Sequence, residues 1–84
     1  MKITLEENDL CLPLPQDDEI LIIRRNNEDG SFAVGLGERG YDTWRGVRRC
    51  KDYVRLVEYF REWVVKPTRM IHLLNQEAKK RGWA

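Results

Sequence analysis

The chain is poor in the residues that build metal and nucleophile sites. It contains only two cysteines, Cys11 and Cys50, and one histidine, His72. No set of them has the spacing of zinc ligands, and a single disulfide is the only covalent link that the two cysteines allow. Catalysis by Cys50 and His72 would require both side chains to meet in space, which nothing in the sequence indicates. We therefore expect a protein without metal, cofactor or enzymatic activity.

Long apolar runs are absent as well. No stretch approaches the about 20 apolar residues of a membrane span, and the first residues, MKITLEENDL, lack the apolar core of a secretory signal. We expect a soluble, cytoplasmic protein with no membrane contact. A chain of 84 residues is the size of one small domain, residues 1–84.

A strong excess of charge is also missing. Fifteen lysines and arginines face 14 acidic residues, for a net charge of +1, whereas dedicated nucleic-acid-binding domains usually carry a clear basic excess. The charge is nevertheless segregated, because residues 1–23 carry one lysine and six acidic residues. Balanced but segregated charge favours a protein partner over a nucleic acid.

The apolar pattern of the first half predicts a small antiparallel sheet. Strands are expected over residues 2–5, 19–25 and 31–36. The run EILIIRR has four consecutive apolar residues, which is typical of a central strand buried on both faces. The turn residues NNEDG join it to the next strand as a hairpin. Pro13 and Pro15 favour an extended segment at a sheet edge.

The second half has the periodicity of two amphipathic helices, about residues 51–65 and 67–81. Pro67 separates them, because it ends one helix and fits the first turn of the next. Trp63 falls on the apolar stripe of the first helix and is expected in the core. Trp83 follows a glycine that can end the second helix, so it can fold back. The predicted fold is α+β, a sheet of three or four strands packed on a C-terminal pair of α-helices.

Residues 43–49 leave two alternatives open, a further strand or the start of a helix. Gly46 would cost a helix about 1 kcal/mol, which favours the strand. A strand would alternate its side chains between two faces, Arg45, Val47 and Arg49 on one and Trp44, Gly46 and Arg48 on the other.

The basic side chains of this region are the main functional candidates. The predicted partner-binding residues are Trp44, Arg45, Arg48, Arg49, Lys51 and Arg55. Trp44 has polar neighbours and is expected to be partly exposed, as aromatic residues beside arginines are in protein interfaces and base-stacking platforms. The cations could contact an acidic protein surface, phosphates, or the chain's own acids, such as Glu19 or Glu28.

Two other patterns carry weaker functional predictions. The carboxylates of Asp17, Asp18 and Glu19 form a second candidate patch, which suits a basic partner better than a metal because neighbouring strand residues point in opposite directions. The run GLGERG, residues 35–40, has the glycine spacing of a dinucleotide-binding loop. It follows a hairpin strand rather than a βαβ unit, so we predict a glycine-rich turn with a bulge at Gly35 or Gly37.

In size and predicted layout the chain resembles the small α+β proteins of phages and mobile elements, including anti-CRISPR inhibitors. The resemblance implies a non-enzymatic inhibitor that blocks a host complex, such as a large nucleoprotein complex, by protein–protein contact. The alternative is a small DNA- or RNA-binding protein that uses the basic cluster from Arg45 to Arg55. A homodimer is also expected, because four apolar side chains exceed what so small a core covers, namely Leu12, Leu14, Trp44 and Trp83.

Overall fold

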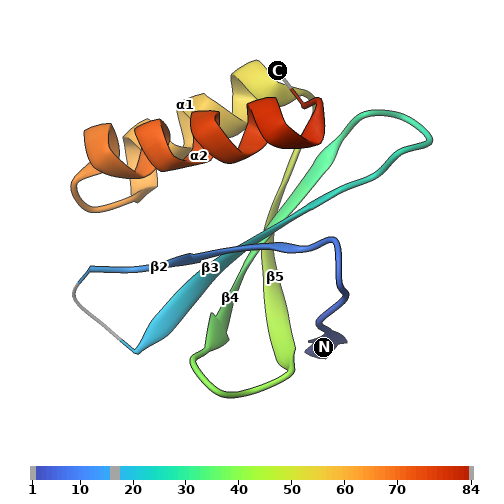
Figure 1. Cartoon of the computed structure of the whole chain (residues 1–84), viewed down its shortest axis with the longest axis vertical. Coiled ribbons are helices and arrows are strands. Elements are labelled where there is room, and N and C mark those ends of the chain that lie inside the picture. The colour runs from blue at the N-terminus through green and yellow to red at the C-terminus, as the bar shows by residue number, and fades with distance from the viewer. Residues whose placement is uncertain (1, 16–17, 84) are drawn as a thin grey trace.

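Two C-terminal helices cover one face of an antiparallel sheet in the computed structural model, which describes residues 2–15 and 18–83 (Figure 1). The strands are β1 (Lys2–Thr4), β2 (Leu10–Pro13), β3 (Glu19–Arg25), β4 (Phe32–Glu38) and β5 (Thr43–Cys50), and the helices are α1 (Tyr53–Trp63) and α2 (Pro67–Arg81). The strand order is β1-β5-β4-β3-β2. The α+β prediction is confirmed. The predicted strand number is wrong, because the sheet has five strands rather than three or four.

The additional pairing comes from segments whose patterns were weak or ambiguous. Residues 43–49 form a strand and not a helix, and β5 continues to Cys50. The proline-containing segment pairs with β3 as β2, a strand of only four residues at the sheet edge. An edge is where prolines are tolerated, since one side of the strand has no neighbour to receive an N–H.

The β3–β4 hairpin forms as predicted. Its turn ends at Gly30, whose φ of 76° lies in the left-handed region that glycine adopts without a steric penalty. The Asp29 carboxylate accepts hydrogen bonds from the backbone N–H and the hydroxyl of Ser31, at 2.9 and 2.7 Å. These bonds fix the start of β4.

The hydrophobic core lies between the sheet and the helices. Alternate residues of β3 and β4 face α1 and α2, and the buried cluster comprises Leu10, Leu12, Leu21, Ile23, Phe32, Val34, Cys50, Leu56, Phe60, Val64, Met70 and Leu74. Ile22 points to the opposite face and is also buried, so the prediction of a strand buried on both faces is confirmed. Each fully buried aliphatic side chain contributes about 1.5–3 kcal/mol to folding.

The helix ends follow the sequence signals. Asp52 caps α1 by accepting a hydrogen bond from the backbone N–H of Arg55 at 2.9 Å. Pro67 occupies the first turn of α2, and Gly82 ends that helix in the left-handed conformation. Trp83 then turns back onto Phe32, with the ring centroids 5.2 Å apart in an edge-to-face arrangement.

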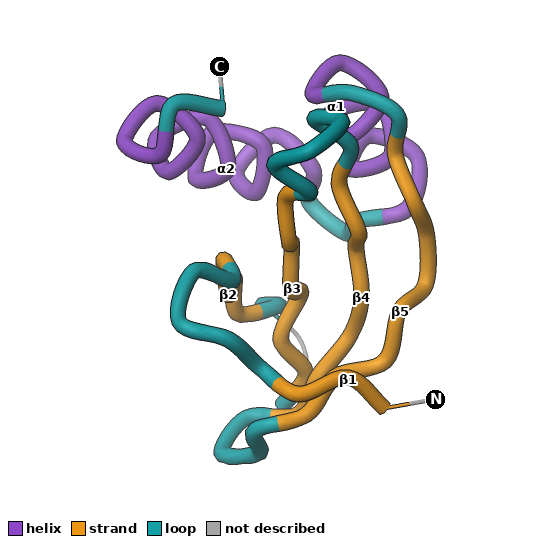
Figure 2. The backbone as a smooth tube through the Cα atoms, turned by 90° about the vertical axis from the view of Figure 1, so that its right-hand side faces the viewer, coloured by secondary structure: helices purple, strands orange, loops and turns teal. Residues whose placement is uncertain are grey.

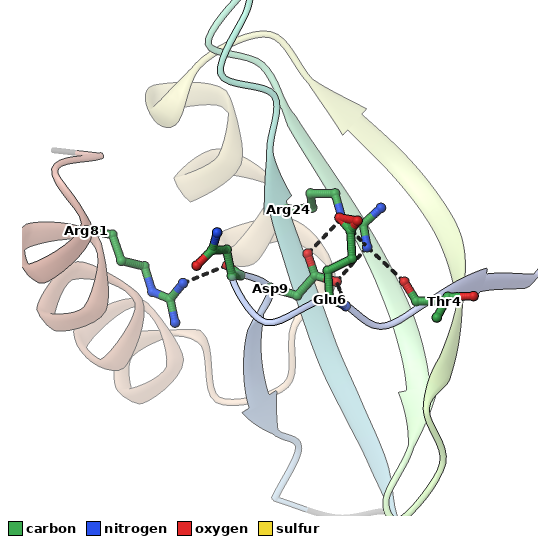
Figure 3. Close-up of polar contacts among 6 residues, drawn as sticks. Thr4, Glu6, Asp9, Arg24 and Arg81 are labelled. Atoms are coloured by element: carbon green, nitrogen blue, oxygen red, sulfur yellow. Dashed lines mark hydrogen bonds and ion pairs between the residues drawn. The ribbon is translucent and has the colours of Figure 1, made fainter.

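Residues 5–9 cross the sheet on the face opposite the helices, and we call them the crossing segment. They run from β1 at one edge to β2 at the other (Figure 2). Arg24 of β3 holds them in place (Figure 3), since its guanidinium donates to the Thr4 carbonyl at 2.9 Å and to both Asp9 carboxylate oxygens at 2.7 Å. From α2, Arg81 donates to the Asn8 carbonyl at 2.7 Å.

Candidate functional site

A bulge in β5 decides where its arginines point. Val34 pairs with Arg48 and Gly35 pairs with Gly46, so Val47 is an extra residue on β5. The predicted glycine-rich turn is wrong, since Gly35 and Gly37 lie within β4, and the extra residue at this irregularity belongs to β5 and not to the glycine-containing strand. An extra residue reverses the alternation of side chains beyond it, because faces alternate strictly in an unbroken strand.

The arginines of β5 therefore lie on faces different from those that simple alternation predicts. Arg48 pairs with Val34 and Arg45 pairs with Leu36, and these partners both face the helices. Arg49 pairs with Ala33 on the opposite face, where Trp44 also lies. The prediction that Arg45 shares a face with Arg49, and Arg48 with Trp44, is wrong because it allowed for no bulge.

The expectation that Trp44 is partly exposed is also wrong, since only 2% of this residue is accessible. Its indole lies against β4 at Gly35, where an added Cβ would be 2.2 Å from Cε3 of the ring. The Arg24 guanidinium covers the ring, 5.2 Å from its centroid. Trp44 is thus buried between β4 and the Arg24 side chain and does not belong to an exposed contact surface.

The ion pair beside Trp44 is a structural one. The Asp9 side chain is 2% exposed and the Arg24 side chain 29%. Burial raises the pKa of the Asp9 carboxyl, but the hydrogen bonds from Arg24 and from the Glu6 backbone N–H outweigh burial, so this pKa lies below its ordinary value. The pair thus stays ionised at neutral pH and fastens the crossing segment over the sheet.

Four cations of the predicted site lie in a groove of about 240 Å³ between β5 and α1, which we call the β5–α1 groove. It is lined by Arg48, Arg49, Cys50, Lys51, Arg55, Glu58, Tyr59, Glu62 and Trp63. Four of these side chains are cationic and two are acidic. Strand β5, the following connection and one side of α1 each contribute to its walls.

Trp63 is the exposed aromatic residue of this groove. It is 68% exposed, so the prediction that it packs in the core is wrong. Leu56, Phe60 and Val64 are buried instead. The buried residues follow a four-residue spacing that continues to Val64 just after the helix. Trp63 is the last residue of α1, and it points to the side of this buried row rather than into the core.

The cations of the groove differ in how far the chain's own acids neutralise them. Arg55 pairs with Glu58 at 3.0 Å, and both side chains are more than half exposed, so this pair contributes little to stability. Arg49 lies 3.9 Å from Asp29 and donates to the Ser31 hydroxyl at 3.2 Å. Within residues 2–15 and 18–83, no salt bridge involves Arg48 or Lys51.

The predicted six-residue site is thus divided. Arg48, Arg49, Lys51 and Arg55 line the β5–α1 groove, and Trp44 is buried. Arg45 lies opposite Lys2 at the far end of the sheet, in a cavity of about 340 Å³ that Glu19 and Glu38 also line.

The acidic patch is only partly placed by the structure. Asp17 lies outside the described residues, Asp18 is exposed, and Glu19 is half-buried at the start of β3. The Asp18 carbonyl accepts a hydrogen bond from the Arg39 backbone N–H at 2.9 Å.

The cysteines are free, and Cys50 contributes to the core at the base of the groove. Burial raises the pKa of the Cys50 thiol above its ordinary value, which disfavours the reactive thiolate. His72 is exposed on α2. In the part of the chain that the structure describes, neither helix is long and apolar enough to cross a membrane.

The apolar side chains behind the homodimer expectation are accommodated within one chain. Leu12 and Trp44 are buried. Leu14 and Trp83 are half-buried and pack against the core. The homodimer stays a prediction, but these four side chains no longer support it.

Comparisons with known proteins give no identification, since no protein family, no curated protein and no solved structure matches this chain.

Proposed function

We propose that the chain is a non-enzymatic binding module whose β5–α1 groove holds an acidic surface of a larger protein. The observation that carries the proposal is Trp63, a large aromatic residue left 68% exposed in the same groove as Arg48 and Lys51, which form no salt bridge within the described ranges 2–15 and 18–83. Tryptophan and arginine are the residues that most often dominate the binding energy of protein interfaces. Covering such a ring removes apolar surface from water, at about 25 cal/mol per Å².

The mode of action in this proposal is occupation of a surface. Arg48 and Lys51 attract an acidic partner during the encounter, and Trp63 then anchors the complex. Small phage-type inhibitors act in this manner, by blocking a surface that a host complex needs. The target in this proposal is a protein of a larger assembly, including a nucleoprotein complex.

Direct binding of single-stranded nucleic acid is the second candidate, because Trp63 next to Arg48 and Arg55 also suits base stacking. Glu58 and Glu62 in the same groove oppose any anion, but the net charge of only +1 lacks the basic excess of dedicated nucleic-acid-binding domains, which makes this candidate the weaker one. Phosphate binding would fall steeply as salt rises from about 50 to 200 mM. A gel-shift assay over that range tests it, and no retardation at the lowest salt would exclude it.

The protein-binding proposal is tested by capture of partners from a host lysate. The chain is immobilised as wild type, as Arg48→Glu/Lys51→Glu, and as the matched control Arg69→Glu/Lys79→Glu, which changes net charge equally at exposed cations of α2 outside the groove. A stoichiometric partner should remain with the control and be lost from the groove variant. Trp63→Ala should weaken binding by about 2 kcal/mol, or about 30-fold. Equal capture by all variants would refute the proposal.

A further inference from the structure

Strand β5 has a free edge along its second half. β1 pairs only with residues Thr43–Arg45, and its register ends at the Lys2–Arg45 pair. Among the residues that the structure describes, no strand lies beside residues 46–50 on that side, as the upper part of β5 shows in Figure 2. A free strand edge presents backbone N–H and C=O groups that an additional strand can pair with.

We propose that an extended acidic segment of the partner adds to the sheet as a sixth strand beside residues 46–50, in line with β1. This inference rests on the proposed function and specifies how the partner is held. Residues 46–50 span about 16 Å as a strand, at about 3.3 Å per residue. Backbone hydrogen bonds would supply affinity, and the flanking side chains would supply selectivity.

The bulge determines what the added strand must carry. Arg48 points to the helix side of the sheet and Arg49 to the opposite side, and both are exposed. Directly opposed residues of neighbouring strands lie on the same face, where opposite charges stabilise the pair. The fitting segment therefore carries carboxylates on both of its faces. The added strand would cover the exposed Val47 side chain. Trp63 and Lys51 lie on the helix side of the same edge.

A second copy of the chain fits this edge poorly. Two β5 edges paired with each other would bring together Arg48 and Arg49 of both copies, and opposed like charges destabilise a sheet. Basic side chains on an edge are a common protection against such self-pairing. The other edge strand, β2, has the sequence LCLP, which offers no carboxylate and ends in a proline. Charge complementarity thus favours a foreign acidic strand.

The test uses a fluorescein-labelled peptide with the sequence EVEEVE, which presents carboxylates on both faces when extended. A second peptide carries N-methyl groups on every residue after the first, which removes the N–H groups of both edges and leaves the charge unchanged. Binding is followed by fluorescence anisotropy at low salt. Backbone amide exchange of the protein is measured by NMR with the unmodified peptide.

EVEEVE reads the same in both directions, so either of its edges can face β5. The peptide that is methylated along both edges should lose at least about tenfold in affinity relative to the unmodified peptide. The amides of residues 46–50 should become protected from exchange. Equal binding of the two peptides would overturn strand addition while leaving an electrostatic partner site intact. Absence of peptide binding, or protection at β2 instead, would also overturn it. The lysate capture described above tests the proposed function separately.

Discussion

The contact between Trp44 and the backbone of β4 makes Gly35 highly sensitive to substitution. A methyl group at Gly35 would lie 2.2 Å from Cε3 of Trp44 and 2.3 Å from the Arg45 carbonyl oxygen. Unstrained contacts between such atoms are about 3.5–4.0 Å. The indole cannot move outward freely, because the Arg24 guanidinium covers it and is itself held by Asp9.

The size of the effect follows from this geometry. Overpacking a core costs about 1–3 kcal/mol, and we expect about 3 kcal/mol for Gly35→Ala because one of the two close neighbours is backbone. Replacing glycine also restricts the unfolded chain, which offsets about 0.5–1 kcal/mol. The net loss in the free energy of unfolding should be about 2 kcal/mol. For a domain of this size that corresponds to a decrease in Tm of about 8–16 °C.

The chain provides a matched control in the residue directly opposite. Gly46 pairs with Gly35 across the ladder, and neither has a positive φ. A methyl group at Gly46 would meet only Cδ1 of Ile3, at an ordinary 3.6 Å. Gly46→Ala should therefore be neutral or more stable by up to about 1 kcal/mol. Urea unfolding followed by circular dichroism measures both variants. The reasoning is refuted if the two unfold within about 0.5 kcal/mol of each other.

Three further predictions concern side chains with different roles. Asp9→Asn should destabilise by about 3 kcal/mol at pH 7, since it leaves the half-buried Arg24 without its carboxylate. The pKa of Asp9 is lower in the folded chain than in the unfolded one. The ionised carboxylate therefore stabilises the fold fully above the unfolded pKa of about 3.9, and this stabilisation is lost as pH falls through the lowered pKa of the folded chain. The stability difference between wild type and Asp9→Asn should therefore shrink in acid, and a constant difference down to the acid transition would contradict this. Trp63→Ala should change the free energy of unfolding by less than about 0.5 kcal/mol, whereas Trp44→Ala should lower it by about 3–5 kcal/mol. Denaturant titrations in which Trp63→Ala is the more destabilising variant would contradict the assignment of Trp63 as exposed and Trp44 as buried. Asp52→Ala should cost about 1 kcal/mol through loss of the α1 N-cap, seen as a lower Tm, and an unchanged Tm would argue against the cap.

Local sequence patterns were sufficient to predict the two helices and the β3–β4 hairpin. The three- and four-residue spacing of apolar side chains predicted both helices, and Pro67 located their boundary, because helix periodicity and proline sterics act within one or two turns. The NNEDG turn predicted the β3–β4 hairpin for the same reason. Strand β1 was predicted over residues 2–5, but β2 has only four residues, too few for a periodic signal. The pairing of both strands depends on partners distant in sequence.

Local sequence patterns predicted only part of the candidate site. The sequence placed Arg48, Lys51 and Arg55 close together along the chain, and the structure brings them to one groove. The exposed aromatic residue beside them is Trp63 and not Trp44. The polar neighbours of Trp44 suggested exposure, but Gly35 and Arg24 enclose its ring. Gly35 and Gly37 were the sequence signal for the burial of Trp44, because a flat ring can lie against backbone that bears no side chains.

The sequence by itself determined the α+β class, the two helices, the hairpin and the segregation of charge, since these follow from the pattern of neighbouring residues. Only the tertiary structure decided the number of strands, the bulge at Val47 and the free edge of β5. It also decided that Trp44 is buried and Trp63 exposed, the reverse of what the sequence suggested. Each of these depends on which distant segments pair and on how far one element extends over another. Periodicity specifies the direction in which a side chain points, and tertiary packing determines what it meets there.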